Sequence, residues 1–116
     1  MAELPFGLPA PAEPWERHAR HVYAGLVDPD QLATDRDDVI VALHRQRIGT
    51  GVHYRAVHRH RFCRERFGYE PDDFPVANRI SDQTLSLPLG PSLSDAEVDD
   101  VIAAARRTAD HFALRR

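Results

Sequence analysis

The chain has 116 residues, enough for one domain, and its composition of 42% hydrophobic and 28% charged residues is ordinary for a globular protein. A formal net charge of −3 gives no general attraction to nucleic acid or to a membrane surface, and no apolar run is long enough to span a bilayer. Because Cys63 is the single cysteine, no disulfide can form within the chain, and we expect a cytoplasmic protein.

The first half of the chain predicts a tail, a strand and a helix. Residues 1–17 are rich in proline and lack apolar periodicity, so we interpret them as a tail or linker and residues 18–116 as the folded domain. The run at 21–27 (HVYAGLV) predicts a short strand. A helix follows, with Thr34 as its N-cap, acidic residues in its first turn and Gly49 just beyond its end.

The second half alternates short strands and helices. Residues 52–54 predict a short strand, and residues 57–67 form either a short helix or a loop. Pro75 is placed as the first residue of a helix, and residues 85–87 (LSL) alternate as a strand does. A capping box at 94–97 (SDAE) begins the last helix. This pattern predicts a two-layer α+β domain, in which a short, mostly antiparallel sheet packs with three or four helices.

Residues 53–66 (HYRAVHRHRFCRER) concentrate the side chains that can carry chemistry. The histidines and Cys63 are metal-competent, but their spacing matches no standard zinc pattern and the arginines repel cations, so we expect no metal site. The same arginines can activate Cys63 as a nucleophile, although a lone cysteine in a helix is commonly a small buried residue. An arginine-rich segment with aromatic residues also suits a nucleic-acid backbone, but the acidic net charge disfavours such a partner.

Recognition of a phosphorylated small ligand is the fourth interpretation of this segment. Arginine presents a planar fork of donors that matches phosphate or carboxylate, and the turn at 49–51 (GTG) brings the backbone into an open loop. On a strand, His53 and Tyr54 point to opposite faces, so that one can face a pocket while the other packs. The alternative is an ordinary glycine turn that joins a helix to a strand.

The chain contains no lysine, since all fifteen of its Lys and Arg residues are arginine. Covalent chemistry on a carbonyl compound through a Schiff base needs a primary amine that can lose its proton, and a guanidinium group cannot do this near neutral pH. We therefore expect the chain alone to be inactive in any reaction of this kind.

Four segments of the chain together resemble one family of enzymes. Residues 48–54 (IGTGVHY) resemble the GIGTGIHY-type motif of the DegT/DnrJ/StrS family of sugar aminotransferases. The other three are HVY at 21–23 before DRD at 35–37, FGY at 67–69 with DFPVA at 73–77, and LSLPL at 85–89 with LSDAEV at 93–98. The segments keep the family's order over residues 18–106, which is most of the chain.

The resemblance implies a pyridoxal 5'-phosphate (PLP) enzyme of fold type I. Such enzymes transfer an amino group, usually from glutamate or glutamine, to a keto group on a nucleotide-linked sugar in polysaccharide or antibiotic-sugar biosynthesis. The part that matches is the carboxyl-terminal small domain, which closes over the cofactor and contacts substrate. The Schiff-base lysine and most of the PLP site would lie on the amino-terminal domain, supplied by a separate large domain or a homodimer partner.

The resemblance also implies which residues bind substrate. His53 and Tyr54 match the family's HY pair, and Arg55 and His58 match the YRAVH continuation of one branch. It therefore implies four substrate-binding residues and no catalytic residue on this chain. The chain departs from that branch at Arg59 and Arg61, which replace an apolar residue and a proline.

Two functions of different classes follow from the sequence. In the first, which the resemblance implies, the chain is a fragment or truncated form of a sugar aminotransferase that contributes substrate contacts only. The alternative is a stand-alone binding or interaction module that uses the Arg/His face of residues 53–66 for a phosphorylated ligand or a partner protein. A contiguous exposed apolar patch would favour the first, because a domain that docks on a larger one keeps such a patch.

Overall fold

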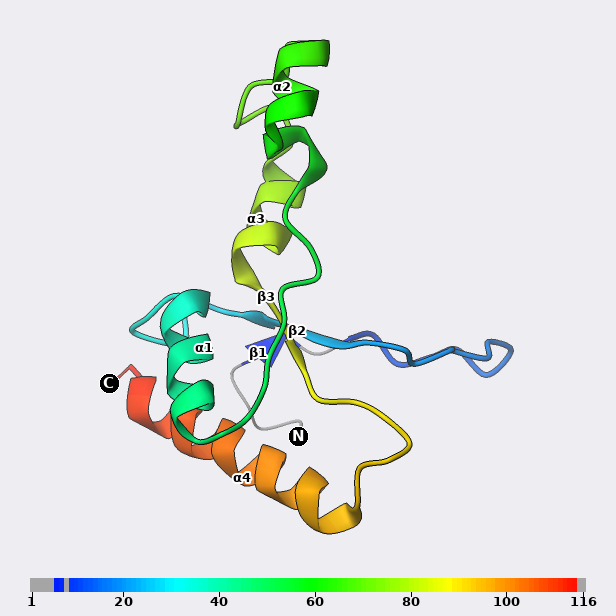
Figure 1. Ribbon diagram of the computed structural model, residues 1–116, viewed down its shortest axis with the longest axis vertical. Helices are drawn as coiled ribbons and strands as arrows, with labels where there is room; N and C mark the ends of the chain where they lie inside the picture. The colour runs from blue at the N-terminus through cyan, green and yellow to red at the C-terminus, as the bar shows by residue number, and fades with distance from the viewer. Residues whose placement is uncertain (1–5, 8, 115–116) are drawn as a thin grey trace.

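Three short antiparallel strands lie at the centre of the molecule (Figure 1). The computed structural model describes residues 6–7 and 9–114. The sheet has the order β1-β2-β3, and its strands are β1 (Phe6–Gly7), β2 (Tyr23–Val27) and β3 (Thr84–Leu87). β1 falls within the residues predicted to be a tail or linker, yet Phe6 is buried in the core. Two residues are too few for apolar periodicity to reveal a strand.

Two long helices pack with this sheet around one hydrophobic core. They are α1 (Arg36–Arg45) and α4 (Asp95–Phe112), which contact each other. The buried core joins the sheet, both helices and the loop before α1; it consists of Phe6, Val27, Leu32, Val39, Leu43, Leu85, Leu87, Ala104 and Ala105. With four helices and three antiparallel strands in the part of the chain that it describes, the structure confirms the predicted α+β class. No helix in the described part of the chain is long and apolar enough to cross a membrane.

Both ends of α1 differ from the prediction by one or two residues. The N-cap is Asp35 and not Thr34, because the Asp35 carboxylate accepts hydrogen bonds from the backbone N–H groups of Asp37 and Asp38. At the other end, Arg47 has a φ of 63°, the left-handed conformation expected for Gly49. The Arg47 and Ile48 N–H groups donate to the last carbonyls of α1, so the helix ends in a Schellman motif built without glycine.

The later elements begin where their sequence signals predict. Pro75 is the first residue of α3 (Pro75–Gln83), and the predicted strand at 85–87 is the greater part of β3. The capping box of α4 is complete, because Ser94 Oγ accepts from the Glu97 N–H and the Glu97 carboxylate accepts from the Ser94 N–H. These signals are local, so they need no knowledge of distant contacts.

The second part of the segment between α1 and β3 forms an arm that extends away from the sheet (Figure 1). This arm, residues 57–83, contains the 3₁₀ turn η1 (Val57–Arg59), α2 (Arg61–Phe67) and α3. Among the described residues, none of the arm belongs to the buried core cluster. The radius of gyration is 16.0 Å, whereas a compact domain of this length would have about 13 Å. Both the arm and the segment between β1 and β2, which extends from the sheet in another direction, account for this extended shape (Figure 1).

Hydrogen bonds tie the base of the arm to the body. The Arg36 guanidinium, mostly buried beside the end of α3, donates to the carbonyl oxygens of Thr84 and Ser81 at 2.9 and 3.4 Å. The buried Ser81 hydroxyl accepts a 2.9 Å hydrogen bond from the Ala56 N–H. Together these contacts hold the start and the end of the arm next to β3.

Candidate functional site

The segment that follows α1 runs beside β3 and carries His53. Gly51 and Ser86 exchange two backbone hydrogen bonds, of 3.1 and 2.7 Å, as an isolated bridge. Beyond this bridge, Nδ1 of His53 lies 2.8 Å from the Ser86 hydroxyl oxygen. The Thr84 hydroxyl donates to the His53 carbonyl oxygen at 3.4 Å. Side chains of β3 therefore fix both the backbone and the imidazole of His53.

The position of the His53 imidazole explains why Gly51, the second glycine of the predicted GTG turn, has no side chain. A Cβ atom on Gly51 would lie 2.9 Å from Cε1 of His53, closer than side chains approach. The imidazole thus packs directly over the Gly51 backbone, and a residue with a side chain would have to displace it.

The prediction of a strand at 52–54 is wrong, and with it the expectation that His53 and Tyr54 point to opposite faces. In the described segment between α1 and η1, Gly51 alone pairs with β3; after it, Ser86 contacts the His53 side chain in place of a backbone ladder. The two rings meet edge to face, with centroids 4.7 Å apart and planes at 85°, across a cis peptide bond. Tyr54 is 72% exposed, so its ring is available to a ligand or a partner.

His58 lies inside the arm. It is 6% exposed, and its Nε2 is 3.1 Å from the Pro71 carbonyl oxygen and 3.0 Å from Oδ1 of Asn78. Its ring also packs on Phe74, with centroids 4.9 Å apart. His58 therefore connects η1 to the start of α3 and shapes the arm from within.

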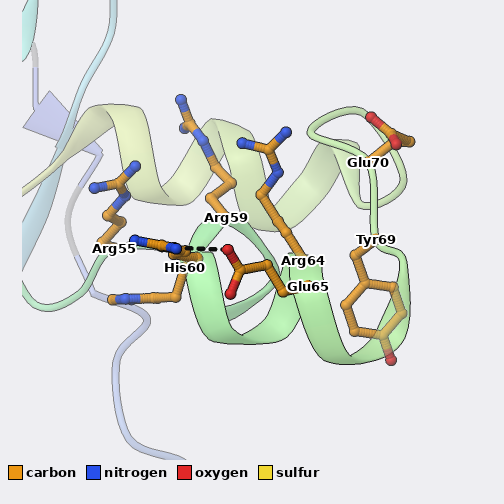
Figure 2. A pocket seen from close by; sticks show the side chains of 8 residues that line it. Arg55, Arg59, His60, Arg64, Glu65, Tyr69 and Glu70 are labelled. Carbon is orange, nitrogen blue, oxygen red and sulfur yellow. Dashed lines mark hydrogen bonds and ion pairs between the residues drawn. The ribbon is translucent and has the colours of Figure 1, made fainter.

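Arg55 lines a basic hollow on the side of the arm (Figure 2). The hollow has a volume of about 750 Å³. Its lining comes from the residues before η1, from η1 and α2, and from the loop that follows; these residues are Arg55, Arg59, His60, Arg61, Arg64, Glu65, Tyr69 and Glu70. Most of the predicted Arg/His face therefore gathers on one surface of the arm.

The two arginines that depart from the family pattern are both paired. Arg59 forms an ion pair with Asp82 of α3, and Arg61 pairs with Glu65 one turn further along α2. Arg61 is exposed and Arg59 is half-buried, and each has a carboxylate partner, so neither is a buried unpaired charge. The arm thus accommodates both substitutions by ion pairing.

Sequence reasoning missed the residues that position the site. Ser86 holds His53, and Ser81 holds the backbone at Ala56, but both are serines in ordinary helix or strand contexts. Their partners lie 33 and 25 residues away in the chain. His60 and Arg64 line the hollow with Arg55, and their four-residue spacing on a helix was the one signal that could have grouped them.

The chain does not supply the reactive group that PLP requires. Fold-type I enzymes hold the carbonyl group of PLP through the primary amine of a lysine. This sequence contains no lysine. Among the described residues there is also no group of three His, Cys, Asp or Glu side chains that could hold a metal ion. This surface presents a fixed imidazole, an exposed phenol and several guanidinium groups.

The fold is that of a part of the sugar aminotransferases. A protein of Streptococcus pneumoniae described as a sugar aminotransferase, Spr1654, matches 95% of this chain with a TM-score of 0.82 at 24% sequence identity, over 27% of its own length. DesV of S. venezuelae, solved in complex with a ketimine intermediate, matches 94% of the chain with a TM-score of 0.80 at 30% identity, over 28% of its length.

The sequence gives the same assignment. The model of the DegT/DnrJ/EryC1/StrS aminotransferase family matches residues 1–106, and the chain belongs to this family. The spore coat polysaccharide biosynthesis protein SpsC of Bacillus subtilis is 47% identical over 91 residues, which are 78% of this chain. Those residues are 23% of SpsC, so the chain spans about a quarter of the relatives that it matches.

Proposed function

We propose that residues 18–116, together with the strand β1 that pairs with them, are the carboxyl-terminal small domain of a PLP-dependent sugar aminotransferase. In this proposal a lysine-bearing large domain would hold PLP, which would supply the chemistry of amino transfer from glutamate or glutamine. The present chain contributes contacts to a nucleotide-linked keto-sugar and is inactive alone. The proposal includes a cytoplasmic location, which agrees with the single cysteine.

The observation that carries this proposal is a row of aromatic side chains along the arm. Phe62 and Phe67 are 70% and 58% exposed, and their ring centroids are 6.3 Å apart. The row continues through Tyr69 to Phe74 with centroid distances of 5.6 and 5.3 Å. A protein that works alone rarely leaves such connected apolar rings in water. The row therefore supports a domain that packs on a larger partner, the expectation that favoured a fragment over a stand-alone module.

The geometry suggests different roles for the four proposed substrate-binding residues. Tyr54 and Arg55 have exposed side chains, so we assign the direct contacts to them. His53 borders the site and is held there by Ser86. His58 acts on the same site from within the arm, because its imidazole keeps η1 and α3 together.

A chimera tests the proposal. This chain would replace the aligned quarter of a full-length family enzyme, and amino transfer from glutamate to a nucleotide-linked keto-sugar would be measured together with PLP content. We expect amino transfer to be retained. Tyr54→Ala and Arg55→Ala should each raise the KM for the nucleotide sugar about tenfold, the loss expected for one hydrogen bond involving a charged or well-placed polar group.

The matched control is Arg106→Ala, since Arg106 is an exposed residue of α4, and α4 lies away from the arm (Figure 1). It should leave the KM and the PLP content unchanged. A chimera that binds PLP on its lysine domain but transfers no amino group would overturn the proposal. So would PLP-competent chimeras in which Tyr54→Ala, Arg55→Ala and Arg106→Ala behave alike.

A further inference from the structure

We propose that Ser86 is a positioning residue that holds the His53 imidazole in one tautomer, with its proton on Nε2, so that the ring offers a hydrogen-bond donor to a ligand. The tautomer follows from contacts within this chain alone. The use of that donor in binding a substrate rests on the proposed function. His53 was among the predicted substrate contacts, whereas nothing in the sequence points to Ser86.

The distance between His53 and Ser86 fixes which nitrogen of the imidazole faces the hydroxyl group. Nδ1 lies 2.8 Å from Ser86 Oγ, which is a hydrogen-bond distance. If the ring were turned over, the carbon Cδ2 would take the place of Nδ1, and contacts of C–H groups with oxygen are about 3.3–3.6 Å long. The same ring packs against the backbone of Gly51, where a Cβ atom would lie 2.9 Å from Cε1. Nδ1 is therefore the nitrogen that meets Ser86.

The number of donors decides where the proton of the imidazole lies. A serine hydroxyl has one proton to donate, and a neutral imidazole has one N–H group and one acceptor nitrogen. Among the described residues, His53 is the hydrogen-bond partner of the Ser86 hydroxyl. If Nδ1 donated to Oγ, the hydroxyl proton would have no acceptor in a buried residue, which is costly. The Ser86 hydroxyl therefore donates, Nδ1 accepts, and the proton of the ring lies on Nε2.

Nε2 of His53 is open to a ligand. It has no hydrogen-bond partner among the described residues, and in that part of the chain no buried side-chain nitrogen or oxygen lacks one. Nε2 therefore reaches the surface, next to the exposed ring of Tyr54, whose centroid is 4.7 Å from that of the imidazole. In this tautomer Nε2 can donate to an oxygen atom but cannot accept a proton. His53 thus favours ligands that present an acceptor at this position.

Nitrogen-15 NMR of the full chain measures the tautomer directly. The protonated and unprotonated nitrogens of a neutral imidazole have different chemical shifts, and exchange between tautomers brings the two averaged shifts closer together. The comparison is His60, an exposed histidine whose ring has no hydrogen bond to any residue that the structure describes. At about pH 8, where histidine is neutral, we expect a larger separation of the two shifts for His53 than for His60. Loss of signals in His53→Gln identifies those of His53.

Two variants test whether Ser86 is responsible. Ser86→Ala removes the donor and should reduce the separation for His53 to about that for His60. Ser86→Thr keeps a hydroxyl group and should retain the larger separation. The shifts of His60 should not change in either variant, and circular dichroism would verify that both are folded.

The chimera tests the role of this pair in binding. Ser86→Ala should raise the KM for the nucleotide sugar about threefold to tenfold, as expected when one well-placed hydrogen bond is weakened. In a His53→Ala background the same substitution should have no further effect, because Ser86 acts through the imidazole.

Three results would contradict the proposal. They are a protonated Nδ1 in the unsubstituted chain, which needs no variant, an unchanged separation for His53 in Ser86→Ala, and an effect of Ser86→Ala on KM that persists without the imidazole. If NMR finds the expected tautomer while the chimera transfers no amino group, the proposed function fails and the assignment of the tautomer to Ser86 stands.

Discussion

Replacing Gly51 by alanine tests whether the imidazole of His53 fills the space above this residue. The new Cβ would lie 2.9 Å from Cε1 of His53, and the ring is the part that can move. Moving it breaks the 2.8 Å contact with Ser86 Oγ. Ser86 is 5% exposed, so its hydroxyl group would lose the hydrogen bond to His53 while it stays buried.

The expected loss of stability is small but measurable. Leaving a buried hydroxyl unpaired costs about 1–3 kcal/mol. Alanine restricts the unfolded chain more than glycine does, and this lower entropy of the unfolded state stabilises the folded protein by about 0.4–1 kcal/mol. The net effect of Gly51→Ala should be a loss of about 1–2 kcal/mol. In a His53→Ala background the obstacle is gone, so the same substitution should stabilise the protein by about 0.4–1 kcal/mol.

Urea unfolding followed by far-UV circular dichroism measures this reversal of sign. Gly49→Ala is the matched control, because nothing lies within 4 Å of a Cβ at that position, and it should not destabilise the protein. Equal destabilisation by Gly51→Ala with and without the His53 ring would refute the reasoning, since the space would then be limited by the backbone.

Two further predictions concern helix ends. Arg47→Gly should stabilise the protein by about 0.5–1 kcal/mol, because relief of the left-handed strain at a φ of 63° exceeds the entropy cost of glycine; a lower urea midpoint would contradict this. In α4, the Ser94 backbone N–H and then its hydroxyl lower the pKa of Glu97 below 4.5. The stability that this carboxylate contributes is therefore present above pH 4.5 and is lost as pH falls through the lowered folded-state pKa. Glu97→Gln removes the titrating carboxylate and should make the thermal midpoint less sensitive to acid between about pH 7 and about pH 3, and an unchanged sensitivity would exclude this linkage.

The elements that the sequence predicts correctly are those with signals in their own residues. The capping box at Ser94 and the proline at the start of α3 act within one helical turn, so they are visible without the rest of the fold. Thr34 failed as a cap because Asp35, the next residue, accepts two backbone hydrogen bonds. Thr34 and Asp35 are both residue types that cap helices, and the backbone conformation in the folded chain decides which of them does so.

The candidate site was harder to predict because its contacts are distant in sequence. Residues 52–54 have the pattern of a strand, but a serine 33 residues beyond His53 captures the imidazole and no ladder forms. The placement of His58 inside the arm depends on Pro71 and Asn78, which α3 brings back to η1. The exposure of Arg55 could be predicted, because arginine is mostly found at the surface and an exposed arginine depends on no contact with a distant residue.

The separation between arm and core has a consequence for how the molecule opens. No described residue of 57–83 belongs to the core cluster, so the free energy that buries Leu43 or Leu85 does not directly protect the arm. The amide hydrogens of α2 should therefore exchange with solvent through a local opening, at a lower cost than those of α1 and α4. The molecule would then unfold in two steps, in which the surface that carries the arginines is released first and the core melts as a separate cooperative unit.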